Sequence, residues 1–157
     1  MDPELRALIL SILKDHRIMS VATLRPDGWP QATTVGYVSA GLVLYFLCGT
    51  DSQKARNIGF CNKISLTIDR DADDLMRLQG LSIAATAEFV TDEKKFSAIF
   101  QSLVNKYPKA KDLPAPDPKT VRYVRVIPKF ISVLDYSKGF GHTDLVEIRP
   151  DDLKAAA

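Results

Sequence analysis

The stretch that decides the fold is residues 18–47, IMSVATLRPDGWPQATTVGYVSAGLVLYFL. Its apolar and β-branched runs are typical of strands, and two turn signals interrupt them. Arg25-Pro26-Asp27-Gly28 predicts a tight turn, and Ala40-Gly41 predicts a second one. We therefore expect three consecutive strands, over residues 18–24, 30–39 and 42–47. The third is almost wholly apolar, so we expect it near the centre of the sheet.

Strand patterns continue further along the chain. Alternating apolar residues predict a fourth strand over 64–68, and 78–90 is expected as a long fifth strand with Gly80 as a bulge. Residues 120–127 and 130–136 are expected as a last pair of strand segments. The proline between them should divide the pair, because proline cannot donate to a strand ladder.

Helical patterns lie before and between these strands, over residues 5–13, 51–60 and 96–107. Asp2 followed by proline is a good cap for the first helix, and Thr91 or Asp92 should cap the third, which Pro108 ends. We expect His16 to cap the carbonyl groups at the end of the first helix.

Six or so antiparallel strands with inserted helices predict a mainly β fold, a closed or partly closed barrel with helical covers. An open α+β sandwich is the main alternative. The 157 residues show no repeat or linker, so we expect one domain, with the stretch from about residue 139 as a candidate flexible tail.

Composition narrows the classes of partner. With 21 basic and 19 acidic residues, the net charge of +2 indicates neither a nucleic-acid partner nor a membrane-surface partner. Asp2, Glu4 and Lys14 interrupt the first apolar stretch, unlike a signal peptide, so a cytoplasmic location is expected. Cys48 and Cys61 lack metal-ligand spacing, and we expect reduced core thiols and no metal site.

The segment Gly49 to Asn57 lies where an apolar strand ends and a helix begins. Free N–H groups and the positive end of the helix dipole attract a phosphate at such a position. Lys54 and Arg56 are unfavourable near a helix start unless an anion binds there. Thr50 and Ser52 offer hydroxyl donors. A capped surface helix with solvated cations is an equally good interpretation of the spacing.

The strand Gln31 to Tyr37 has hydroxyl groups on both faces and Gly36 in its interior. A glycine weakens a strand unless some group must approach its backbone closely. A planar ring lying across the strand would provide that reason, with Thr33 and Thr34 as hydrogen-bonding partners. The alternative is a bulge in which threonine serves β-propensity.

Taken in order, these segments resemble the pyridoxamine 5′-phosphate oxidase-like split-barrel family, which binds FMN. The matching stretches, spread over residues 5–136, are Met19–Leu24, Pro26–Gly28, Pro30–Val35, Ser52–Lys54 with Asn57, Leu78–Gly80 and Ala87–Phe89. Each motif is loose, and their succession is what is specific.

The resemblance implies an antiparallel Greek-key split β-barrel that forms a homodimer with FMN at the subunit interface. By position, Thr33, Thr34 and Val35 would line the flavin ring. The residues around its phosphate would be Thr50, Ser52, Gln53, Lys54 and Asn57. Gln79 matches a glutamine that in some relatives reaches the flavin from the partner subunit.

The chain also departs from that family. True pyridoxamine phosphate oxidases end in a segment with arginine and histidine that grips the substrate phosphate, and Ile148-Arg149-Pro150 is a poor substitute. We therefore expect a flavin reductase or another FMN-dependent oxidoreductase acting on a small molecule. No catalytic residue is assigned; His142 is a candidate proton donor or a solvated tail residue. A binding module without turnover is the alternative, and FMN is expected ahead of F420, FAD and haem.

Overall fold

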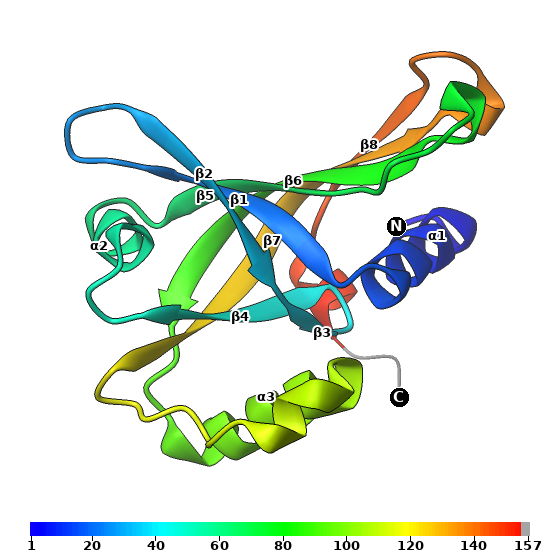
Figure 1. The fold of residues 1–157 in the computed structure, drawn as a ribbon. Helices are drawn as coiled ribbons and strands as arrows, with labels where there is room; N and C mark the ends of the chain where they lie inside the picture. The colour runs from blue at the N-terminus through cyan, green and yellow to red at the C-terminus, as the bar shows by residue number, and fades with distance from the viewer. Residues whose placement is uncertain (155–157) are drawn as a thin grey trace.

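The computed structural model describes residues 1–154, and its centre is one curled antiparallel sheet (Figure 1). Within these residues the strands are β1 Ile18–Leu24, β2 Pro30–Gly36, β3 Val38–Ala40, β4 Val43–Gly49, β5 Lys63–Ile68, β6 Gln79–Phe89, β7 Val121–Asp135 and β8 Thr143–Glu147. They are hydrogen-bonded in the order β2-β1-β5-β6-β7-β4-β3, and β8 pairs with β7. The predicted mainly β class is confirmed.

The sheet splits along β7. Its first half pairs with β4 over Val121–Val126, and its second half pairs with β8 over Phe130–Leu134. β6 pairs with β7 along its whole length. Two diverging half-sheets therefore share the long antiparallel pair β6–β7, and the core lies inside their curl.

The first predicted hairpin is present. Arg25 N donates to Trp29 O at 3.0 Å, and Gly28 adopts φ +88°, which favours glycine. β4 is not central as expected, because it lies second from the end of the sheet order. Both faces of β4 are nevertheless covered, which explains its apolar sequence. Leu44 and Phe46 face the main core, and Tyr45 on the other face packs against the helix that follows β6.

The second predicted strand is divided rather than continuous. β2 ends at Gly36 and β3 begins at Val38. Tyr107 causes the break, because its hydroxyl accepts a hydrogen bond from Tyr37 N at 3.0 Å and donates to the Arg17 carbonyl. A Cβ at position 36 would lie 3.1 Å from that hydroxyl. The group that approaches Gly36 is therefore a tyrosine of this chain, so neither the bound ring nor the bulge considered for this position accounts for the glycine.

The proline in β7 does not divide the strand. Pro128 pairs with Ala85 and Phe130 with Ala84, so Lys129 is an extra residue in a bulge. This bulge accommodates the missing N–H of the proline. Gly80, the predicted bulge, is instead regularly paired; a Cβ there would lie 3.1 Å from the Ile68 carbonyl oxygen.

Helices α1 Pro3–Asp15, α2 Gln53–Phe60 and α3 Glu93–Lys106 cover the sheet (Figure 1). Their caps are Asp2, Ser52 and Asp92, each accepting a hydrogen bond from a backbone N–H in the first turn. Short 3-10 turns occupy Leu75–Arg77, Pro108–Asp112, Tyr136–Lys138 and Pro150–Leu153. Among residues 1–154, no helix has the length and apolar character to cross a bilayer.

The stretch after residue 139, for which the sequence predicted no element, contains β8. Ile148 N donates to Lys129 O at 2.8 Å, and the Ile148 side chain is buried in the core. Arg6 in α1 donates to the Asp152 carbonyl at 2.9 Å. The end of the described chain is thus tied to both the bulge of β7 and the first helix.

Candidate functional site

The turn between β4 and α2 contains the predicted phosphate-binding residues. Ser52 Oγ donates to Gly49 O at 2.8 Å and accepts from Ala55 N at 3.1 Å. Thr50 N and Oγ1 both lie within hydrogen-bonding distance of the Thr120 carbonyl, at 2.9 and 3.3 Å. The two hydroxyls therefore shape the turn. As the first two residues of α2, Gln53 and Lys54 have N–H groups without an acceptor inside the helix.

The positive charge of this turn is concentrated on Lys54. The Lys54 side chain is half-buried, and no hydrogen bond or ion pair engages its ammonium group among residues 1–154. Arg56 instead folds back across the turn and donates to the Asp51 carbonyl at 2.8 Å and to Gln53 Oε1 at 3.2 Å. Lys54 is thus the cation of this turn that is available to a ligand.

A second cation lies at the end of β4, before the turn. Arg122 in β7 pairs across the ladder with Cys48, at the end of β4. Burial raises the pKa of the Cys48 thiol, while a hydrogen bond with Ser52 and the charges of Lys54 and Arg122 oppose this rise. Arg122 was not predicted, because 68 positions separate it from Lys54 and only the β4–β7 pairing brings it to the end of β4.

A buried amide connects α2 to the first hairpin. Asn57 is fully buried; its Nδ2 donates to Thr23 Oγ1 at 2.9 Å and to Gln31 Oε1 at 3.2 Å. Its Oδ1 accepts from Gln53 Nε2 at 2.8 Å. Gln53 and Asn57, both predicted beside a phosphate, therefore bind each other. Their network fixes the start of α2 against β1 and β2, and sequence reasoning missed Thr23 and Gln31.

The predicted ring-lining residues lie on β2, at one end of the sheet order. Thr33 and Val35 share its half-buried face with Gln31, whereas Thr34 lies on the opposite, exposed face. The side chains of Thr33 and Thr34 therefore cannot line the same side of a ring. Because β2 ends the sheet order, its outer backbone edge has no strand partner among residues 1–154.

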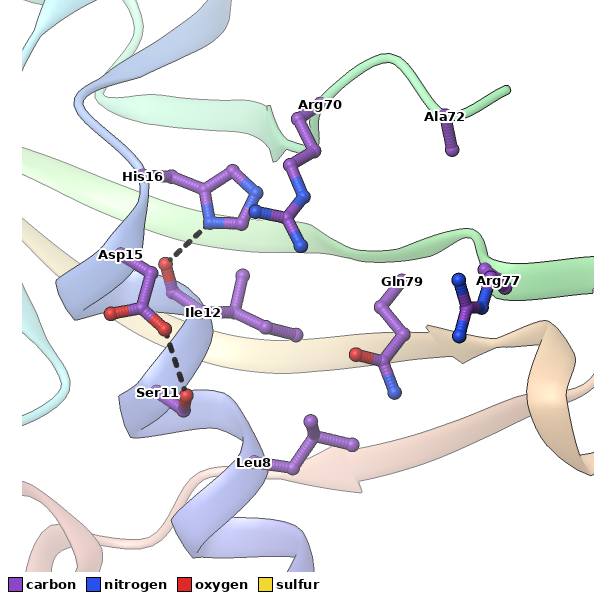
Figure 2. A pocket seen from close by; sticks show the side chains of 9 residues that line it. All are labelled: Leu8, Ser11, Ile12, Asp15, His16, Arg70, Ala72, Arg77 and Gln79. Carbon is purple, nitrogen blue, oxygen red and sulfur yellow. Dashed lines mark hydrogen bonds between the residues drawn. The ribbon is translucent and has the colours of Figure 1, made fainter. Parts of the chain in front are cut away.

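Gln79 lies far from this turn in the same chain. Lys63, just after α2, pairs with Thr86 in β6. Seven residues of β6 separate Thr86 from Gln79, and an extended strand of that length spans about 23 Å. Figure 2 shows the Gln79 side chain in a separate cavity beside α1. Its Nε2 donates to Asp135 Oδ1 at 3.0 Å. Burial raises the pKa of Asp135, but hydrogen bonds from Ser137 and Gln79 outweigh this and hold it below its usual value.

His142 also lies away from α2. Its Nε2 is 3.0 Å from Asp144 Oδ2, which also accepts from Lys138 Nζ at 3.0 Å. The two partners lower the pKa of Asp144, the Lys138 hydrogen bond having the larger effect. His142 thus belongs to a surface ion-pair cluster, and no other predicted site residue contacts it among the described residues.

Comparisons with known proteins place this geometry in a family. The sequence profile described as Pyridoxamine 5′-phosphate oxidase matches residues 1–153. A search of curated proteins finds no match.

Solved structures share the fold at low sequence identity. A candidate pyridoxamine 5′-phosphate oxidase from Listeria innocua has a TM-score of 0.70 at 21% identity, over 83% of this chain and 98% of that one. A conserved hypothetical protein from Mycobacterium tuberculosis has a TM-score of 0.75 at 24% identity, with 92% and 91% covered. The heme storage protein HutZ from Vibrio cholerae has a TM-score of 0.66 at 18% identity, with 76% and 87% covered.

The profile match spans nearly the whole chain, and the split sheet with its covering helices agrees with the solved folds. The chain therefore belongs to the pyridoxamine 5′-phosphate oxidase family.

Proposed function

We propose that this protein binds FMN and acts as an FMN-dependent oxidoreductase on a small molecule other than pyridoxamine phosphate. The flavin phosphate binds at the start of α2, and the ring extends along β2. Two copies of the chain form a homodimer with one flavin at each of two equivalent sites along their interface.

The observation that carries the proposal is the charge of α2. Its first turn has no acidic residue and contains Lys54, whereas the first turns of α1 and α3 contain Glu4 and Glu93. A cation near the positive end of a helix dipole is unfavourable, and a dianion bound there reverses the sign of that interaction. Arg122 adds a second positive charge near the same turn. This arrangement fits a phosphate ester.

The contacts of α2 indicate in which direction the flavin ring extends from the phosphate, namely along β2. The Asn57 network joins the helix start to Gln31, and Thr33 and Val35 follow Gln31 on the same half-buried face. A ligand anchored by its phosphate at α2 therefore meets these side chains next. Thr34 faces away, so we assign it a role only through its backbone.

In the proposed homodimer, the glutamine that contacts the flavin is Gln79 of the partner subunit. Within one chain, Gln79 lies on β6, three strands from β2 in the sheet order, and its side chain lies in the cavity beside α1. Gln79 of the partner subunit would complete the site, as the family resemblance implies. The flavin supplies the redox chemistry when bound, and Lys54, Thr33 and Val35 bind and orient it.

The identity of the copurifying ligand tests the proposal. We expect the purified protein to be yellow and to release FMN, identified by its mass, and added FMN to restore colour to protein stripped of it. Protein that stays colourless with excess FMN would contradict the proposal. Oxidation of NAD(P)H with a defined acceptor then tests turnover.

A second candidate is a binding module for haem, F420 or flavin without turnover. The structural likeness to the heme storage protein HutZ favours it, as does the likeness to a heme binding protein from Mycobacterium smegmatis. An intense Soret band in place of a flavin spectrum would support this candidate. Bound FMN that no electron donor reduces would support a flavin carrier.

A further inference from the structure

A cavity of about 70 Å³ lies between the last turns of α1 and the start of β6 (Figure 2). His16 and Asp15 line it from the end of α1, and Arg70, Arg77 and Gln79 line it from the loop after β5 and the start of β6. One water needs only about 10–15 Å³, so the cavity has room for a small organic molecule. Figure 1 shows α1, which provides one wall of the cavity, at the other end of the sheet from α2.

His16, which lines the cavity, has one ring nitrogen without a hydrogen-bond partner among the described residues. Its Nδ1 lies 2.8 Å from the Ile12 carbonyl oxygen, which can only accept, so Nδ1 carries the hydrogen. In the neutral ring, Nε2 is then an acceptor. Nε2 is buried, and no group among residues 1–154 hydrogen-bonds it. A buried acceptor without a partner is unfavourable, so a ligand with an N–H or O–H donor fits here.

The opposite wall provides donors. Arg70 and Arg77 both line the cavity, and Figure 2 shows their guanidinium groups with the other lining side chains. Neither arginine has a hydrogen-bond or ion-pair partner within the described part of the chain. Asp15 is the one carboxylate among the lining residues, and it accepts from Ser11 at 3.1 Å on the α1 side. Among the residues that line the cavity, the cations therefore come from the loop and the acceptors come from α1, although the loop outside the lining also carries four aspartates.

We infer that this cavity binds a small organic acid that also carries a hydroxyl or amine donor. The acid group binds Arg70 and Arg77 through charge-assisted hydrogen bonds, and the donor binds His16 Nε2 or the Asp15 carboxylate. Because Gln79 forms part of the wall, the acid would lie beside the flavin in the proposed homodimer. Binding of the acid itself does not require the flavin.

The imidazole signals of the full chain test this inference by NMR. The chain has two histidines, so His142→Gln identifies the His16 ring signals. Lactate should shift the His16 Nε2 resonance saturably and leave His142 unchanged. Propionate, which lacks the hydroxyl donor, should bind about tenfold more weakly. A shift that sodium chloride reproduces, or equal binding of the two acids, would overturn the inference.

Surface variants separate the site from general charge effects. Arg77→Gln and Arg70→Gln should each weaken lactate binding by about tenfold, since each removes a charge-assisted hydrogen bond. Arg25→Gln is the matched control, because Arg25 pairs with Asp27 at a hairpin tip outside the cavity lining. Equal affinity in the cavity variants and the control would contradict the assignment. No flavin is used, so this result is independent of the FMN test.

Discussion

Replacing Lys54 by alanine should weaken FMN binding by about 10- to 100-fold and change riboflavin binding by less than about twofold. Only FMN carries the phosphate, and Lys54 is the available cation of the α2 turn. Quenching of flavin fluorescence on titration with stripped protein measures both affinities. The loss for FMN should shrink as salt concentration rises, because screening weakens the attraction.

Lys63→Ala is the matched control for this experiment. Lys63 is exposed at the start of β5, a few residues after α2 and outside its first turn. The Lys63→Ala substitution should leave the affinities for FMN and riboflavin unchanged. If Lys54→Ala lowers riboflavin and FMN affinity equally, then Lys54 supports the fold or the ring, and its assignment to the phosphate is wrong.

Replacing Asn57 by alanine should lower the free energy of unfolding by about 2–4 kcal/mol. Asn57 is fully buried and bonds Thr23, Gln31 and Gln53. Truncating the Asn57 side chain removes the Nδ2 donor from Thr23, which is only 3% exposed, and opens a small void beneath α2. Urea unfolding followed by circular dichroism measures the change.

The same variant should also weaken FMN and riboflavin together, because the network holds the helix start against β2. Asn105→Ala is the control, since Asn105 is exposed on α3 and its side chain bonds only Gln101 among the described residues. This substitution should lower the free energy of unfolding by less than about 0.5 kcal/mol. An Asn57→Ala protein as stable as this control would show that the buried network contributes little.

Local signals in the sequence predicted much of the fold. The Pro26-Asp27-Gly28 turn and the caps Asp2 and Asp92 are present because short-range chemistry decides them. Long-range contacts caused the errors. Tyr107 interrupts the second strand from 70 residues away, and a bulge at Lys129 lets β7 continue through its proline.

In the candidate site, too, local patterns predicted some residues and long-range contacts brought in others. The α2 turn was found because a strand end followed by Ser52 and Lys54 is a local pattern. Arg122 and Gln31 were missed because strand pairing and a buried amide bring them to the turn. The opposite faces of Thr33 and Thr34 followed from strand alternation, but which face is half-buried depended on the packing of the whole sheet.

A crystal structure of the protein grown with excess FMN tests the central claim most directly. We expect the phosphate within hydrogen-bonding distance of Lys54 Nζ, the ring beside Thr33 and Val35, and Gln79 of the partner subunit at its far side. A flavin bound elsewhere, or a Lys54 side chain in bulk solvent beside an empty turn, would contradict the account.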